Sequence, residues 1–365
     1  MFRQNKKPIV AGRNSKGSRM FDGLVGNAEV VSLIRRFAVS GRMPNAMVFA
    51  GPDGVGKRQF AFEIGRMFAC QRLADREACG SCPACRRVGP IELPEPIDRN
   101  KARFEKVVFG EHGDIGLVAP YRRFILVDAI RDLEAQGRFR PFEGRARLFI
   151  IDEADKMNEA ASNALLKTLE EPAPTTHICL ITSRAERLLP TIRSRCQIVR
   201  FAPLRAAEIE RVLVERRGFS AADAALAARL SGGSVGRAFA MDLGEFRARR
   251  ERLVSVLENA TVQANFAEVL RISEELTDAK NKDRFESNLD ILESLLRDVW
   301  MVGSGGPSDL IVNSDLLEVL SKFSSNASPA EVSDWLEDIQ ELRKQLAVNV
   351  NLRIATDALF VRMAA

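Results

Sequence analysis

The sequence lacks any uninterrupted apolar run near the length of about 18 residues that a membrane-crossing helix needs, so no membrane span is expected. The first 19 residues carry six basic side chains, no acidic one and no apolar segment, which argues against a secretory signal. We therefore expect a cytoplasmic, reducing environment. Residues 1–20 are predicted to be a solvated, disordered basic tail, with a nucleic-acid-binding arm as the alternative.

A strong charge of one sign is also missing. The chain has 54 basic and 49 acidic residues, which leaves a net charge of +5. This balance permits contact with nucleic acid without requiring it. The length of 365 residues predicts two or three domains, and the apolar fraction of 46% is enough to form their cores.

Short apolar runs alternate with helical patterns in the first half of the chain. The runs predict strands at residues 47–50, 147–151, 177–182 and 197–201. The helical patterns between them place their apolar residues on one face, as with Phe60, Ile64, Met67 and Phe68. A second such pattern begins at Ala154 and stops before Pro172. Strands that alternate with helices indicate a parallel sheet covered on both faces, here over residues 21–203.

No strand pattern follows Pro203. Residues 206–217 and 221–231 predict two short helices in a small module at 204–245, and the pattern is helical from 246 to 365. Two stripes of apolar residues there are typical of helix cores: Phe285, Leu289, Leu292, Leu296 and Val299, then Val332, Trp335, Ile339, Leu342 and Leu346. The second of these helices opens with a capping box at residues 328–331.

A glycine-rich turn follows the first predicted strand. Residues 51–58 read Gly-Pro-Asp-Gly-Val-Gly-Lys-Arg and stand between a strand and a helix, the context of a phosphate-binding loop. Gly51, Gly54 and Gly56 let successive backbone N–H groups face a phosphate, and Lys57 is placed to reach the β- and γ-phosphates. The loop predicts a site for ATP or ADP.

The last position of this loop differs from the motif of a working ATPase. A Ser or Thr is expected there, because its hydroxyl ligates Mg²⁺. Arg58 has no acceptor atom and carries a positive charge, so it cannot ligate the metal. Nucleotide can still bind through the backbone and Lys57, but Mg²⁺-assisted hydrolysis is expected to be weakened or lost.

Two acids follow the predicted strand at 147–151. Asp152 is placed to hold the metal's water shell and Glu153 to polarise an attacking water, although a strand can simply end in two solvated acids. Ser183, at the end of the next strand, is a candidate for sensing the γ-phosphate or an ordinary polar strand end.

Four of the six cysteines lie within sixteen residues: Cys70, Cys79, Cys82 and Cys85. Clustered cysteines in a reducing compartment are typical of metal ligands. Four thiolates at this spacing predict a structural, tetrahedral Zn²⁺ site in a zinc module at residues 70–85; four free thiols are the alternative. His112 is a candidate substitute ligand, but its distance in sequence favours an ordinary loop histidine.

Together these motifs resemble the clamp-loader subunits of bacterial DNA polymerase III, which are AAA+ proteins. The resemblance rests on the cysteine spacing after the phosphate-loop helix and on three runs of sequence. These runs are residues 150–155 (Ile-Ile-Asp-Glu-Ala-Asp), 163–172 (Asn-Ala-Leu-Leu-Lys-Thr-Leu-Glu-Glu-Pro) and 189–196 (Leu-Pro-Thr-Ile-Arg-Ser-Arg-Cys). It is strong over residues 21–205 and weaker beyond them.

The resemblance implies a P-loop NTPase domain of the AAA+ type, a small helical lid and an all-α collar that assembles a five-membered ring. Gamma/tau and delta subunits would be the partners in that ring, which opens the sliding clamp and places it on primed DNA in the bacterial cytoplasm. Of the two kinds of phosphate-loop subunit, Arg58 favours the delta-prime kind over the ATP-hydrolysing gamma/tau kind. The chain would then be part of a DNA polymerase holoenzyme with little or no ATPase activity of its own.

The resemblance also implies a role for Arg195. In the family, the arginine of Ser-Arg-Cys reaches into a neighbouring subunit's ATP site as an arginine finger. The alternative is an arginine paired with a carboxylate of its own chain. Arg237 lies one residue later than the family's lid arginine, so a nucleotide-sensing role is not expected of it, and residues 88–110 resemble an insertion without an assigned function.

Two other functions are compatible with this sequence. The chain can be an active ATPase of the gamma/tau type, in spite of Arg58. It can also be a zinc-dependent nucleic-acid-binding protein with a vestigial phosphate loop, which would bind duplexes in a salt-sensitive manner.

Overall fold

The computed structural model describes residues 20, 21, 23–278, 284–346 and 351–364. The chain divides into two compact units, of which the first ends at Phe239 and the second begins at Ala240. The predicted basic tail lies outside the described residues except for Met20, whose side chain is buried. Among the helices described, none combines the length and the apolar character that a membrane crossing requires.

The first unit is built on a six-stranded sheet with the order β2-β3-β4-β5-β1-β6. Neighbouring strands run parallel, except for the antiparallel pair β2 and β3. The strands are β1 (Ala46–Ala50), β2 (Val108–Phe109), β3 (Ile115–Val118), β4 (Arg147–Ile151), β5 (Thr176–Thr182) and β6 (Gln197–Arg200).

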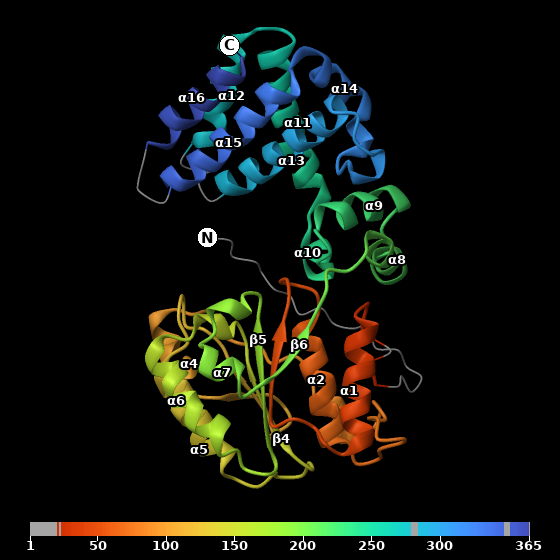
Figure 1. Cartoon of the computed structure of the whole chain (residues 1–365), viewed down its shortest axis with the longest axis vertical. Helices are drawn as coiled ribbons and strands as arrows, with labels where there is room; N and C mark the ends of the chain where they lie inside the picture. Colours follow the sequence, from red (N-terminus) through yellow and green to blue (C-terminus); the bar gives the residue numbers. More distant parts are fainter. Residues whose placement is uncertain (1–19, 22, 279–283, 347–350, 365) are drawn as a thin grey trace. The chain divides into compact units, whose positions relative to one another are not determined.

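Helices cover both faces of this sheet (Figure 1). Helices α1 (Ala28–Ser40) and α2 (Lys57–Ala69) lie on one side, and α5 (Val127–Gly137) and α6 (Glu159–Glu170) lie on the other. Every residue of β1, β4 and β5 is buried, which explains why these strands read as continuous apolar runs rather than alternating ones. The prediction of a parallel sheet covered on both faces is confirmed.

The four predicted strands are confirmed, but β2 and β3 are missing from the prediction. Strand β3 has only four residues, and one of them is Gly116, which weakens the apolar pattern. Gly116 is needed there because a Cβ at this position would overlap the Val107 side chain. Strand β2 lies inside the predicted insertion, as does the short helix α4 (Lys101–Phe104), so the end of that segment belongs to the sheet domain.

The helix predicted from Ala154 onward begins later. Residues 154–156 form a single 3₁₀ turn, and α6 starts at Glu159. The side chain of Asn158 accepts a hydrogen bond from the Ala161 N–H at 2.9 Å and caps the helix. The cap at Asn158 therefore fixes the start of the helix, although the apolar spacing extends back to Ala154.

A buried ion pair fixes the beginning of β4. Arg147 is fully buried and donates to the carbonyl of Gln136 at 2.5 Å. Asp114, also fully buried, lies 3.8 Å from its Nε and accepts hydrogen bonds from the backbone N–H groups of residues 142–144. Burial lowers the pKa of Arg147, while the charge of Asp114 opposes that shift. The pair anchors the loop that joins α5 to β4.

Helices α8 (Ala206–Arg217) and α9 (Ala221–Leu230) complete the first unit, and α10 (Val235–Ala240) ends at the first residue of the second. The first two match the two short helices predicted after Pro203. Ser220 caps α9 through the Asp223 N–H at 3.1 Å. The assignment of this module as a separate lid at 204–245 stays a prediction.

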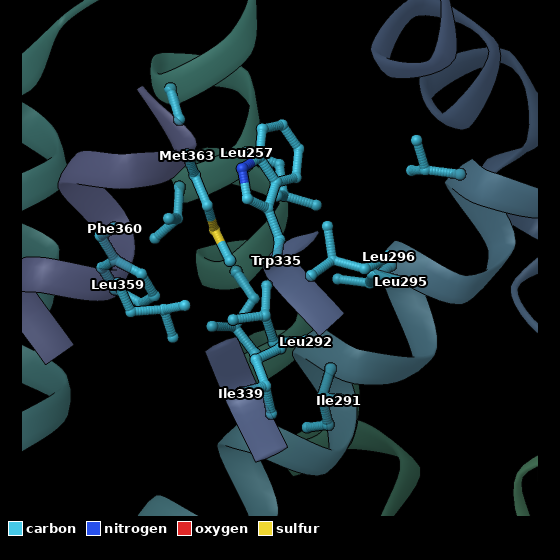
Figure 2. Close-up of a cluster of buried hydrophobic side chains, with 14 of the residues drawn as sticks. Leu257, Ile291, Leu292, Leu295, Leu296, Trp335, Ile339, Leu359, Phe360 and Met363 are labelled. Carbon is cyan, nitrogen blue, oxygen red and sulfur yellow. The ribbon is translucent and has the colours of Figure 1, made fainter. Parts of the chain in front are cut away.

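In the second unit, most of the described residues are helical, and the helices share one core. Its helices are α11 (Leu243–Thr261), α12 (Phe266–Thr277), α13 (Phe285–Gly303), α14 (Leu317–Asn326), α15 (Pro329–Leu346) and α16 (Leu352–Met363). Figure 2 shows how Leu257 of α11, Leu292 of α13, Trp335 and Ile339 of α15 and Phe360 of α16 converge on this core.

The predicted apolar stripes of this unit are confirmed as core positions, apart from Leu346, whose side chain lies outside the described part. The capping box is also confirmed. The Ser328 N–H donates to the Glu331 carboxylate at 2.7 Å, and the Glu331 N–H donates to the Ser328 hydroxyl at 3.3 Å.

Candidate nucleotide site and cysteine cluster

The predicted phosphate-binding loop lies between β1 and α2, as expected. Gly51 comes so close to the carbonyl oxygen of Phe201 that a Cβ at this position would overlap it. Gly54 has a φ of 76°, in the left-handed region, and a Cβ there would overlap the Ser234 hydroxyl. Both glycines are therefore required by close approaches of the backbone within this unit.

The ammonium group of Lys57 contacts its own loop. It donates to the carbonyl oxygens of Gly51 at 2.5 Å and Pro52 at 2.7 Å, and Asp53 lies 3.9 Å away. Only 5% of the side chain is exposed. The loop carbonyls thus supply the acceptors that a buried ammonium group requires.

Arg58, the residue in the magnesium position, forms an ion pair with Asp152. Its Nη2 donates to Oδ2 of Asp152, and the two side chains are 32% and 10% exposed. Arg58 stands at the beginning of α2, whereas Asp152 follows β4. The contact therefore joins the two halves of the predicted site, and it places a fixed positive charge on the carboxylate that was expected to hold Mg²⁺.

Glu153 has a strained backbone with a φ of 52°, and its carboxylate pairs with Lys156 at 2.5 Å. Together with Asp53, Asp152 and Ser183 it lines a pocket of about 430 Å³ at the ends of β4 and β5. The structure thus brings the predicted residues Asp152, Glu153 and Ser183 to one opening.

Sequence reasoning missed a second ion pair beside this pocket. Asp155 accepts hydrogen bonds from the Thr182 hydroxyl at 2.7 Å and from Nε and Nη2 of Arg184 at 3.0 and 2.6 Å. Burial opposes the charge of Asp155, but the bonds from Thr182 and Arg184 outweigh it and lower the pKa of its carboxyl. The feature of the sequence that could have pointed to this pair is Asp155 itself, a third acid soon after Asp152 and Glu153.

The segment before α10 contacts the phosphate-binding loop directly. The Gly236 N–H donates to the carbonyl oxygen of Gly54 at 2.9 Å, and the Ser234 hydroxyl lies against the same glycine. The Arg237 side chain is exposed, and the backbone N–H of Arg237 donates to the Ser234 hydroxyl at 3.1 Å. Backbone and small side chains of this module therefore contact the loop at Gly54.

The four clustered cysteines converge. The Sγ atoms of Cys70, Cys79, Cys82 and Cys85 all lie within 4.8 Å of one another. Cys70 directly follows α2, and Cys85 lies in α3 (Pro83–Arg87), so the cluster joins these helices. His112 takes no part in it among the described residues: its Nδ1 accepts from the Asp114 N–H at 3.3 Å in a buried turn.

Backbone N–H groups point at three of these sulfur atoms. Cys70 accepts from Cys79 at 3.3 Å, Cys79 from Cys82 at 3.4 Å and Cys82 from Cys85 at 3.4 Å. Burial opposes the thiolate of Cys79, but hydrogen bonds from the Ser81 and Cys82 backbone outweigh it and lower its pKa to about 6. Burial, with the neighbouring thiols Cys82 and Cys70, raises the pKa of Cys85. The N–H donors favour metal-ligating thiolates.

Arg195 lies between α7 (Pro190–Arg193) and β6, away from the pocket residues in sequence. Its Nη1 donates to the carbonyl oxygen of Thr191 at 3.0 Å, and its Nη2 lies 2.7 Å from Glu170. The side chain is 37% exposed. Arg195 therefore forms an ion pair with a carboxylate of its own chain, the alternative to the finger role. Its side chain is still partly exposed.

Two family models match the chain. One, described as DNA polymerase III, delta subunit, matches residues 26–205, and the other, described as its C-terminal part, matches residues 245–361. The delta' subunit of DNA polymerase III from Bacillus subtilis strain 168 is 29% identical over 325 residues, which are 89% of this chain and 92% of the relative. That of Escherichia coli K12 is 27% identical over 329 residues, 89% and 90% of the two chains.

A gamma/tau subunit matches a smaller part. That of Mycobacterium tuberculosis strain H37Rv is 32% identical over 175 residues, which are 48% of this chain and 27% of the relative. The two delta' relatives are thus matched along almost their whole length, while this gamma/tau relative is matched over about a quarter of its length.

The Asp155 network leads to a prediction. Because the pKa of Asp155 is lowered in the folded state, its contribution to stability is present above the ordinary Asp pKa of about 4 and is lost as the pH falls through the folded pKa. We expect Asp155→Asn to lower the free energy of unfolding at pH 7 by about 1–3 kcal/mol. The loss should shrink on acidification, as measured by urea denaturation.

Asp128→Asn is the control, because Asp128 is an exposed acid paired with Arg131 at 3.2 Å on α5. It should change the free energy of unfolding by less than about 0.5 kcal/mol. A loss for Asp155→Asn that does not depend on pH would contradict the assignment.

Proposed function

The chain belongs to the DNA polymerase III delta-prime family, and on that premise we propose that it is a clamp-loader subunit that does not hydrolyse ATP itself but donates Arg195 to a neighbouring subunit's ATP site. One observation carries the first half of this proposal, the ion pair between Arg58 and Asp152. The second half rests on the Ser-Arg-Cys motif and on the exposure of Arg195.

The Arg58–Asp152 pair argues against metal-assisted hydrolysis in this chain. A working P-loop site holds Mg²⁺ with a Ser or Thr hydroxyl and an Asp at the end of a neighbouring strand. Here the hydroxyl is absent, and the Asp carboxylate already bonds a cation of the protein. Binding of Mg²⁺ would require this ion pair to break and would place two cations, Mg²⁺ and the Arg58 guanidinium, close together.

The segment before α10 does not use the loop groups that a phosphate would need. A phosphate is bound mainly by the N–H groups of such a loop. The bond from Gly236 goes to the carbonyl oxygen of Gly54, and Ser234 lies against the same glycine. ATP or ADP would bind through the loop backbone and Lys57, without help from Mg²⁺.

Donation of Arg195 needs an exposed guanidinium and a partner with a competent site. A guanidinium near a γ-phosphate stabilises the charge that develops in the transition state. Gamma/tau and delta subunits are the proposed neighbours in a five-membered ring, assembled through the helical collar at 246–365. The ring would open the sliding clamp and place it on primed DNA in the bacterial cytoplasm.

Zn²⁺ is the proposed metal of the cysteine cluster. Tetrahedral Zn²⁺ with sulfur ligands at about 2.3 Å requires sulfur atoms that lie about 4 Å apart, and the four Sγ atoms meet this need within 4.8 Å. With four protein ligands no position is left for a substrate, so the ion would be structural. It would hold residues 70–87 to the end of α2.

Arginine donation is tested by Arg195→Ala in a ring reconstituted with gamma/tau and delta subunits. Loss of an arginine finger slows the affected site by about 10³-fold or more, so ring ATP turnover should fall by the share that this site contributes. Arg187→Ala, at an exposed arginine upstream, is the matched control. Ring turnover that is unchanged by Arg195→Ala, with the ring still assembled, would falsify the donation.

The absence of Mg²⁺-assisted hydrolysis is tested by measuring ATP turnover and nucleotide binding of the purified chain. The chain alone should turn over ATP far below ~1 s⁻¹, the lower range of ordinary enzymes, and calorimetry should find no Mg²⁺-dependent gain in ATP affinity. Arg58→Thr frees Asp152 and supplies a hydroxyl, so Mg²⁺ should then strengthen ATP binding by about tenfold, or ~1.4 kcal/mol.

Arg58→Ala is the matched control for that substitution, because it frees Asp152 without supplying a hydroxyl. Only the Thr variant should respond to Mg²⁺. An active ATPase of the gamma/tau type would instead show Mg²⁺-dependent binding and turnover with Arg58 in place.

Metal analysis tests the cysteine cluster. We expect about one zinc per chain, the stoichiometry of a four-thiolate site, and loss of this zinc in Cys82→Ser. Cys196→Ser removes a cysteine outside the cluster and should keep the metal. The absence of zinc from protein purified without chelators would exclude the proposed site.

A further inference from the structure

The environment of Arg195 leads to an inference that rests on the proposed role of this residue as a finger. Glu170 ends α6, and its carboxylate lies 2.7 Å from Nη2 of Arg195. We propose that Glu170 is a positioning residue, which holds the Arg195 guanidinium in an extended, outward arrangement before a partner's ATP site docks on it.

The two elements that carry these side chains are fixed by the core. Leu169, next to Glu170, and Ile192, in the short helix before Arg195, are both buried in one apolar cluster. The distance between the end of α6 and the end of α7 is therefore set by packing. The ion pair can therefore form without a shift of either backbone segment.

The guanidinium is held at two points. Its Nη1 donates to the carbonyl oxygen of Thr191 at 3.0 Å, while Nη2 faces Glu170. A guanidinium has five N–H donors in a rigid planar fork, so these two contacts fix its plane and leave other donors for a phosphate. A free arginine side chain would have to lose its rotamer freedom at the moment of docking, whereas a side chain already held loses less.

The position of Glu170 is unfavourable without such a partner. A carboxylate at the last residue of a helix lies at the negative end of the helix dipole. The basic residue of the same helical turn, Lys167, lies 3.6 Å from Glu134 of another helix. The cation that compensates Glu170 is thus Arg195, which lies 25 positions along the chain.

The negative charge of Glu170 also repels an incoming phosphate, and this repulsion opposes the benefit of positioning Arg195. This repulsion acts through solvent, since the Glu170 side chain is 51% exposed, and it is screened by salt. The ion pair at 2.7 Å acts directly on Arg195. We therefore expect the ion pair to dominate, so that removal of the charge slows the partner's site.

The experiment compares two adjacent glutamates in the reconstituted ring. Glu171 is exposed and makes no ion pair within the described part of the chain, so Glu171→Gln is a matched control for Glu170→Gln. Glu170→Gln should lower the kcat of ring ATP turnover by about threefold, the range of an exposed ion pair. The KM should stay the same, because the groups that bind ATP belong to the partner.

A double-substitution cycle with Arg195→Ala separates positioning from a general structural effect. In the Arg195→Ala background, Glu170→Gln should cause no further loss. A loss that persists in that background, or an unchanged or raised kcat for Glu170→Gln alone, overturns the inference. If Arg195→Ala itself leaves turnover unchanged, the finger has failed; if it slows turnover and Glu170→Gln does not, only the positioning role has failed.

Discussion

The ion pair between Arg58 and Asp152 determines what the nucleotide site of this protein can do. In a metal-dependent site, a divalent ion bridges the phosphate-binding loop and the acid of a neighbouring strand. Here a side chain of α2 makes that bridge to the end of β4. Because the cation is part of the chain, it joins the two elements without a bound metal ion.

The other contacts around the loop act in the same direction. Lys57 bonds the loop carbonyls, Gly236 bonds Gly54, and Asp155 ties the end of β4 to Arg184 beyond β5. The Lys57 bonds engage the ammonium group that a phosphate would otherwise bind, and the other two bonds tie neighbouring segments to the loop and to the end of β4. These contacts are compatible with the proposed role, in which the chain presents Arg195 to a neighbouring subunit.

The general fold could be predicted from the sequence because its central strands are buried on both faces and read as apolar runs. β3 was missed because it is short and contains Gly116, and the start of α6 was misplaced because the cap at Asn158 overrides the spacing. Only part of the candidate site could be predicted from the sequence. Motifs identified Arg58 and Asp152 separately, but no sequence pattern links two residues 94 positions apart as an ion pair. The burial of Arg147 beside Asp114 could not be predicted either, since an arginine normally lies at the surface.

The residues of a nucleotide motif can therefore have structural partners of their own. Lys57 and Asp152 match an ATPase motif, yet in this fold one satisfies the carbonyls of a tight loop and the other neutralises Arg58. Replacing either would leave a partly buried charge or buried acceptors without a partner, which is costly whether or not ATP ever binds. The presence of a phosphate-binding motif is thus weak support for hydrolysis, and the contacts of its charged residues are the stronger criterion.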